Sequence, residues 1–344
     1  MAEPEASLID RIASYDSVAI VGLAKNAGKT ECLNYILRGL HDRGLTPAVT
    51  SRGVDGEQTD AVSHTRKPEI TLFEETVFVT SESFYRSRGV TSEVLGIGTR
   101  ATALGRLVTA RVKTHGKVIL AGPPDTASLR RLIADLGAYS PDVTLVDGAL
   151  SRLSSASPAV TDALVLATGA ALAPSIPEIT RRTAFVCDVM RLPALPPEMA
   201  RRLEDVERGV VAVDAHGGIH DLGLPSAIAL GSAAPDIPPD TALLYVAGAV
   251  TDRLLATLRQ LPQADGMALA MRDFSCMFAS REAFTAFTSK GGAIFVARPC
   301  RVLAICVNPT SPAGYRVDSR RLCDSIKEKT GIDTIDVRLN RTLP

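Results

Sequence analysis

A stretch of twenty residues near the N-terminus constrains the fold most strongly. Residues 18–37 read VAIVGLAKNAGKTECLNYIL, an apolar run, then the loop GLAKNAGKT, then an amphipathic helical pattern. Four apolar residues recur at helical spacing after the loop, namely Leu33, Ile36, Leu37 and Leu40. A buried strand, a loop of small residues and a helix in this order are typical of a largely parallel α/β sheet.

The loop ends in Gly28-Lys29-Thr30, three residues that can bind phosphate. Small residues let backbone N–H groups converge on phosphate oxygens at the positive end of the following helix. Lys29 would reach the β- and γ-phosphates, and the hydroxyl of Thr30 would bind Mg²⁺. We therefore expect ATP or GTP, with Mg²⁺, to be bound by six consecutive residues: Asn26, Ala27, Gly28, Lys29, Thr30 and Glu31.

The spacing of the loop departs from the usual phosphate-binding motif. G-x-x-x-x-G-K-[ST] requires a glycine five positions before Gly28, and Leu23 stands there, whereas Gly22 is one residue too early. The pattern favours a variant phosphate loop. The alternative is a plain strand-to-helix turn in which Lys29 is only solvated.

A magnesium nucleotide also needs carboxylates near the loop. Asp147 ends the apolar run VTLVDG, whereas two prolines set Asp125 beyond its run VILAGPP, so we prefer Asp147. The alternative for Asp147 is a helix cap. Asp55 lies in SRGVDGEQTDAV (51–62), where it would face the γ-phosphate, unless this segment is a polar surface loop. The predicted catalytic residues are Lys29, Asp147 and Asp55, and the predicted metal ligands are Thr30, Asp147 and Asp55.

The composition limits the class of protein. The 344 residues include 38 Lys+Arg and 38 Asp+Glu, a balance that argues against a nucleic-acid partner. The N-terminus lacks a secretion signal, and no apolar run is long enough to span a bilayer. The six cysteines form no C-x-x-C pair, so we expect buried, reduced thiols in a cytoplasmic protein without a membrane partner.

The order of apolar runs predicts two domains. We expect a nucleotide-binding domain over 1–190, a proline-rich linker over 191–208 and a smaller C-terminal α/β domain over 209–344. The first domain has expected strands at 17–22, 46–50, 117–122, 143–148, 163–168 and 183–189. The second has expected strands at 209–214, 227–230, 243–248, 267–271, 293–297 and 302–307. Because only four residues separate the last two, we expect a hairpin and hence a mixed sheet.

Two glycine-containing segments receive simpler interpretations. GIGTRATALGRL (96–107) reads as a loop that enters a helix. The pair His216 and His220 encloses two glycines, which favours a turn over a metal-binding helix.

The assembled motifs resemble a P-loop group that includes dethiobiotin synthetase and the molybdopterin-guanine-dinucleotide accessory protein. This similarity covers about the first 190 residues and rests on AKNAGKT, RGVDGEQTDA and the DGA that contains Asp147. Dethiobiotin synthetase usually has Glu-Gly where this chain has Asp147-Gly148. The resemblance implies a P-loop NTPase domain, and it leaves open an ATP-dependent ligase or kinase that acts on a small carboxylate.

Nearly the whole chain resembles the lysine 5,6-aminomutase reactivase subunits, the KamB family. The stretches that carry this likeness are VGLAKNAGKT (21–30), TSRGVDGE (50–57), LAGPP (120–124), LVDGALSR (145–152), LATGAAL (166–172) and NPTSPAGY (308–315). The resemblance implies a reactivating chaperone with a second, MutS-related ATPase subunit, in which ATP binding or hydrolysis restores an adenosylcobalamin-dependent aminomutase. A third possible function is that of a GTP- or ATP-binding accessory protein. A homodimer is also possible.

Overall fold

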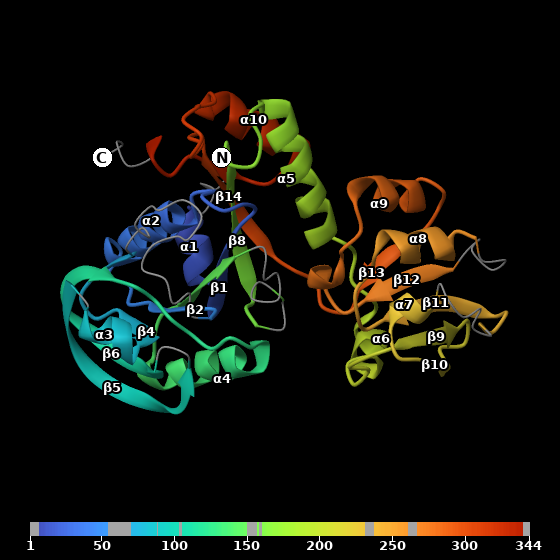
Figure 1. The fold of residues 1–344 in the computed structure, drawn as a ribbon, viewed down its shortest axis with the longest axis horizontal. Coiled ribbons are helices and arrows are strands. Elements are labelled where there is room, and N and C mark those ends of the chain that lie inside the picture. The colour runs from blue at the N-terminus through green and yellow to red at the C-terminus, as the bar shows by residue number, and fades with distance from the viewer. Residues whose placement is uncertain are drawn as a thin grey trace, which may run out of the picture. The chain divides into compact units, whose positions relative to one another are not determined.

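The chain folds into two compact units, built from residues 1–184 with 302–344 and from residues 185–301 (Figure 1). The structure is a computed structural model that describes residues 7–53, 70–87, 89–102, 105–149, 157, 160–230, 237–260 and 267–339. The second unit is thus inserted into the chain of the first. It follows that both ends of the described sequence contribute to one sheet.

The first unit is organised around a ten-stranded sheet, with β1 (Ser17–Gly22) between β7 (Thr144–Ala149) and β8 (Ala163–Gly169). The strand order is β15-β14-β8-β1-β7-β2-β4-β6-β3, and β5 pairs with β6. The remaining bounds are β2 (Ala48–Ser51), β3 (Ile70–Leu72), β4 (Val77–Ser81), β5 (Gly89–Thr102), β6 (Gly105–Val118), β14 (Val302–Asn308) and β15 (Thr334–Ile335).

The sheet is parallel from β15 to β4 and antiparallel beyond β4. Its central strands β1 and β8 are buried along their whole length, as expected for strands covered on both faces. The expected largely parallel α/β sheet is therefore confirmed.

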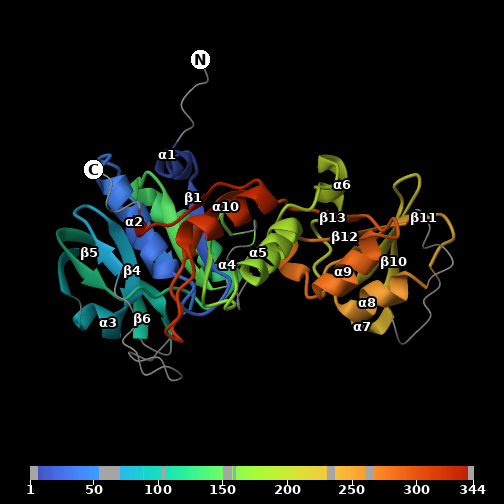
Figure 2. The same ribbon diagram turned by 90° about the horizontal axis from the view of Figure 1, so that it is seen from above.

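Helices cover both faces of this sheet (Figures 1 and 2). On one face, α1 (Leu8–Ala13) and α2 (Lys29–His41) share a core with Val18 and Ile20. On the other face, Leu129 of α4 (Thr126–Leu136) packs with Val146. The other helical elements of this unit are α3 (Glu82–Arg86), η1 (Gly137–Tyr139) and α10 (Ser319–Thr330).

The second unit contains a smaller, mixed sheet in the order β10-β9-β11-β12-β13. The first two pairings are antiparallel and the last two parallel, so the expected mixed sheet is confirmed. Its strands are β9 (Val210–Asp214), β10 (Ile219–Leu224), β11 (Thr241–Val246), β12 (Ala268–Met271) and β13 (Ile294–Val296). Its helices are α6 (Pro197–Arg202), α7 (Ala227–Leu230), α8 (Asp252–Leu258), η3 (Phe274–Cys276) and α9 (Arg281–Thr288), while α5 (Ile176–Met190) crosses the boundary between the units.

The return of the chain to the first sheet differs from the predicted organisation. We expected 293–297 and 302–307 to form a hairpin in a C-terminal domain over 209–344. Instead, β14 pairs in parallel with β8, and β13 pairs with β12 in the other sheet. The reason is that VLAICVN is an apolar run whose middle five residues are buried, which suits a strand covered on both faces.

Four further predictions of secondary structure were wrong. Of the expected strand at 117–122, only residues 117 and 118 are in a strand, at the end of β6. Residues 183–189 and 227–230 are helical, not strands. The longer run that contains 183–189 starts with Ile176 and Pro177, and proline favours the first helical turn. Residues 96–102 lie in β5 and residues 105–107 in β6, two strands that pair in antiparallel fashion, so these residues do not enter a helix.

Within the described ranges, none of the helices has the length and apolar character needed to cross a membrane.

Candidate functional site

The loop between β1 and α2 turns through two residues with positive φ. Asn26 has φ +62° and Gly28, the N-cap of α2, has φ +94°. The Leu23 N–H donates to the Ala167 carbonyl at 2.8 Å, and the Ala27 N–H donates to the Ala24 carbonyl at 3.2 Å. These bonds fix the start and the middle of the loop.

The N-terminus of α2 offers unpaired backbone donors. Gly28 supplies no side-chain cap. No acceptor among the described residues is bonded to the backbone N–H groups of Gly28, Lys29 or Thr30. The first N–H groups of a helix carry a partial positive charge, so this end of α2 can receive an anion.

The structure brings Lys29 and Asp147 together from separate parts of the sequence. β7 lies beside β1 in parallel, so both chains leave the sheet at its carboxyl edge. The Lys29 Nζ lies 2.9 Å from Asp147 Oδ1, and the side chains are 26% and 18% exposed. Asp147 Oδ1 is nevertheless buried without a hydrogen bond of good geometry among the described residues. The contact is therefore electrostatic, and a better partner could replace it.

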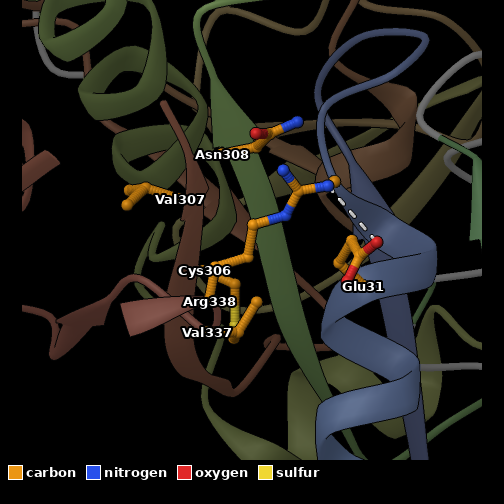
Figure 3. A pocket seen from close by; sticks show the side chains of 7 residues that line it. Glu31, Cys306, Val307, Asn308, Val337 and Arg338 are labelled. Carbon is orange, nitrogen blue, oxygen red and sulfur yellow. Dashed lines mark hydrogen bonds and ion pairs between the residues drawn. The ribbon is translucent and has the colours of Figure 1, made fainter. Parts of the chain in front are cut away.

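Thr30 and Glu31 complete the first turn of α2. Both are half-buried, and Glu31 Oε1 lies 3.4 Å from Arg338 Nη2. Figure 3 shows the Arg338 guanidinium reaching towards Glu31 beside Asn308. The C-terminal segment thus adds a cation next to the loop.

A small cavity adjoins Gly28, with an empty volume of about 220 Å³ that is partly open to solvent. This volume includes open solvent, and the enclosed part has room for little more than a water molecule, so the cavity alone does not hold a nucleotide. Its lining comprises Gly28, Glu31, Cys306, Val307, Asn308, Val337 and Arg338 (Figure 3).

Asn308, at the end of β14, lines the cavity and contacts the loop between β1 and α2. Its Nδ2 donates to the Asn26 carbonyl at 3.2 Å. A Cβ on Gly28 would lie only 2.8 Å from the Asn308 Cβ, so the close approach and the positive φ both require glycine. Sequence reasoning missed this contact because it assigned β14 to another domain.

The ends of β8 and β14 also meet at this edge of the sheet. The Ala170 N–H donates to the Asn308 carbonyl at 2.9 Å. A Cβ on Gly169 would lie 1.9 Å from that same oxygen. The Tyr315 hydroxyl donates to the Ala170 carbonyl at 2.6 Å. The stretches LATGAAL and NPTSPAGY therefore form one joined structure beside the loop.

The structure gives different information on the two other candidate carboxylates, Asp55 and Asp125. Asp55 lies outside the described residues. Asp125 is the N-cap of α4 and accepts the Ser128 N–H at 2.8 Å, a bond that lowers the pKa of Asp125. Capping thus explains Asp125, which agrees with the preference for Asp147.

The predicted turn at His216 and His220 is confirmed. It links β9 to β10, and His220 Nε2 lies 2.8 Å from Asp214 Oδ2. In the part of the chain that the structure describes, no group of three His, Cys, Asp or Glu side chains could hold a metal ion.

The fold and the site together define an α/β protein with a largely parallel sheet and a lysine–carboxylate pair at its carboxyl edge. Searches against family models, curated proteins and solved structures find no match to the chain.

Proposed function

We propose that the first unit binds a magnesium nucleoside triphosphate, ATP or GTP, through a variant P-loop at residues 26–31. The observation that carries the proposal is the contact of Lys29 Nζ with Asp147 Oδ1 at 2.9 Å. A cation for phosphate and an anion for magnesium thus stand side by side at the N-terminus of a helix. In open α/β sheets, ligands bind at this carboxyl edge.

The chemistry of the loop fits a polyphosphate. Three backbone N–H groups, from Gly28 to Thr30, have no acceptor among the described residues, and Asn26 and Gly28 have the positive φ values that let a loop curl around an anion. Asp147 Oδ1 is buried without a well-formed hydrogen bond. A bound Mg²⁺ would supply positive charge to neutralise the phosphates.

The side chains have separate roles in this proposal. Asp147 holds Lys29 at the loop, and its carboxylate would bind magnesium or a water on the metal when the nucleotide is present. Lys29 would bind phosphate oxygens, and Thr30 would offer its hydroxyl to the metal. Asn308 positions the loop through the Asn26 carbonyl.

The first experiment measures binding of MgATP and MgGTP to the full chain by isothermal titration calorimetry. Lys29→Ala should weaken binding about 10- to 100-fold, because a hydrogen bond to a charged group contributes about 1.5–3 kcal/mol. Asp147→Asn should weaken binding with Mg²⁺ but have little effect when Mg²⁺ is chelated. The wild-type ratio of the two affinities decides between adenine and guanine.

Exposed residues of the second unit provide matched controls. Lys290→Ala and Asp240→Asn make the same chemical changes at exposed positions and should leave both affinities unchanged. Equal affinities in Lys29→Ala and the wild type would refute the proposed site.

We further propose that the nucleotide serves a protein client, an adenosylcobalamin-dependent aminomutase, together with a MutS-related ATPase subunit. The sequence likeness to the reactivase subunits supports this proposal. The separate unit at 185–301 is consistent with it, because that unit leaves a second surface for partner proteins.

The client proposal is tested by reactivation. This protein, the ATPase subunit and MgATP are added to suicide-inactivated aminomutase, and turnover with fresh adenosylcobalamin should return. Lys29→Ala protein should not restore it. No recovery and no release of damaged cobalamin would refute the client. ADP formation by this protein alone, dependent on a small carboxylate, would indicate a ligase or kinase instead.

A further inference from the structure

Two cysteines that are far apart in the sequence meet beside the loop. Cys32 lies on α2, two residues after Thr30, and Cys306 lies on β14. Their sulfur atoms are 3.1 Å apart, although 274 positions separate them in the chain. A disulfide bond measures about 2.05 Å, so the sulfurs need to move only about 1 Å to bond.

The pair is distinct from the other cysteines. All six cysteines are free thiols, and Cys32 and Cys306 are the pair joined by a sulfur–sulfur contact at hydrogen-bond distance among the described residues. Cys32 is 0% exposed and Cys306 is 2% exposed, and both belong to the aliphatic core of the first unit. This location shields the pair from large thiol reagents.

Cys306 nevertheless has a route to a small molecule, because it lines the cavity beside Gly28 (Figure 3). An oxidant as small as hydrogen peroxide that reaches this cavity would meet Cys306 first. Cys32 is not among the residues that line the cavity, and its sulfur contacts the Cys306 sulfur. This arrangement separates the thiol that reacts first from the thiol that resolves the product.

We propose that Cys32 and Cys306 form a reversible disulfide in response to hydrogen peroxide. The Cys306 sulfur attacks one peroxide oxygen, the O–O bond breaks, and water leaves, which yields a sulfenic acid on Cys306. The Cys32 sulfur then attacks the Cys306 sulfur, the S–O bond breaks, and the departing hydroxide takes the Cys32 proton as water. In sum, two thiols and one peroxide give one disulfide and two waters.

The surroundings of Cys306 determine how fast its thiol reacts. The hydrogen bond with Cys32 and burial raise the pKa of Cys306 well above its ordinary value. Thiolate is the reactive form, so the raised pKa slows the reaction of Cys306 with an oxidant.

The disulfide would link the proposed nucleotide site to β14, an effect that rests on the proposed function. It would draw the first turns of α2 towards the strand that carries Asn308. Gly28 and Asn308 already make a close contact, so the loop has little room to adapt. We expect nucleotide affinity to fall about fivefold or more, a usual size for coupling between sites.

The test treats the full chain with hydrogen peroxide under native conditions and measures its intact mass. The expected product has lost two hydrogen atoms, and peptide mapping should show Cys32 joined to Cys306. Dithiothreitol should reverse the change. Cys32→Ser and Cys306→Ser should each prevent the link, whereas the matched control Cys323→Ser should retain it.

Peptide mapping of the wild type keeps the test decisive even if a serine in the core hinders folding. Six free thiols after oxidation, or a different cysteine pairing, would overturn the proposal. Calorimetry with MgATP then tests the consequence. Equal affinity of the oxidised and reduced proteins would overturn the link to the loop. If the reduced protein binds neither MgATP nor MgGTP, the proposed function fails while the mapped disulfide stands.

Discussion

Asp147 of the first unit differs in its partners from Asp273 and Asp214, two strand-end aspartates of the second unit. Asp147, in β7 of the first sheet, contacts Lys29 from a neighbouring element, and its Oδ1 accepts no well-formed hydrogen bond among the described residues. Asp273, after β12 of the second sheet, is fully buried and accepts the Ser275 N–H at 2.9 Å. Asp214, at the end of β9, accepts the N–H groups of its own turn.

This difference separates a carboxylate available for a ligand from carboxylates that hold the fold. Asp273 and Asp214 satisfy backbone donors within four residues of themselves, so their partners are fixed by the local chain. Asp147 has the side-chain ammonium of Lys29 as its partner, which can be exchanged without breaking a turn. Local hydrogen bonding therefore argues for a structural role for Asp273 and Asp214 and an exchangeable role for Asp147.

The largest expected effect tests this contrast directly. Asp273→Ala should destabilise the second unit by about 2 kcal/mol, because it leaves the half-buried Ser275 N–H without its acceptor. Asp147→Ala should change the stability of the first unit by less than about 1 kcal/mol, since it removes only a partly exposed ion pair. Urea unfolding followed by hydrogen exchange, read separately for each unit, measures both. Equal losses in the two variants would abolish the distinction.

A smaller difference is expected between two glycines of the first unit. Gly28 and Gly44 both have positive φ, but only a Cβ on Gly28 meets a neighbour, at 2.8 Å from Asn308. Both Gly→Ala variants should lose about 1 kcal/mol or more to backbone strain. Gly28→Ala should lose about 1 kcal/mol beyond that from overpacking. Urea midpoints of the two variants measure the difference, and identical midpoints would contradict the tight contact.

The smallest effect concerns Asp214 in acid. Hydrogen bonds from His220 first, and then from the Gly218 N–H, lower its pKa from 3.8 to about 2. A lowered folded-state pKa means that the stabilisation is complete above about pH 4 and is lost as the pH falls towards 2. Carboxyl NMR shifts should therefore report a midpoint near 2 for Asp214, and His220→Ala should move it upwards. A midpoint near 3.8 in the wild type would show that the turn does not hold this carboxylate.

The sequence predicted those parts of the fold that local pattern determines. The strands β1, β7 and β8 consist mainly of apolar runs, and α2 has a clear apolar stripe, so the sequence predicts their types and positions. The antiparallel pair β5–β6 could not be predicted in this way, because glycines interrupt its pattern and suggest a loop. The helix at 183–189 was missed because its β-branched and aromatic residues have strand propensity, which the longer helix overrides.

The candidate site was predictable only in its separate parts. Lys29 and Asp147 each follow an apolar run, but their proximity depends on β7 lying next to β1, a long-range pairing. Asn308, Cys306 and Arg338 lie about 280 or more positions after the loop. These residues lie beside the loop because β14 pairs with β8 in the first sheet. No local sequence pattern predicts that pairing.

The insertion of the second unit has a consequence for how the protein is made. β8 and its partner β14 are separated by 132 residues, from Ala170 to Arg301, so the ribosome makes β8 long before β14. During synthesis, the second unit has all its strands before β14 has left the ribosome, because domains generally fold as units as the chain emerges. Until then, β8 is an unpaired edge, and such edges invite aggregation. The nascent chain therefore passes through an interval in which it needs protection that the finished protein does not.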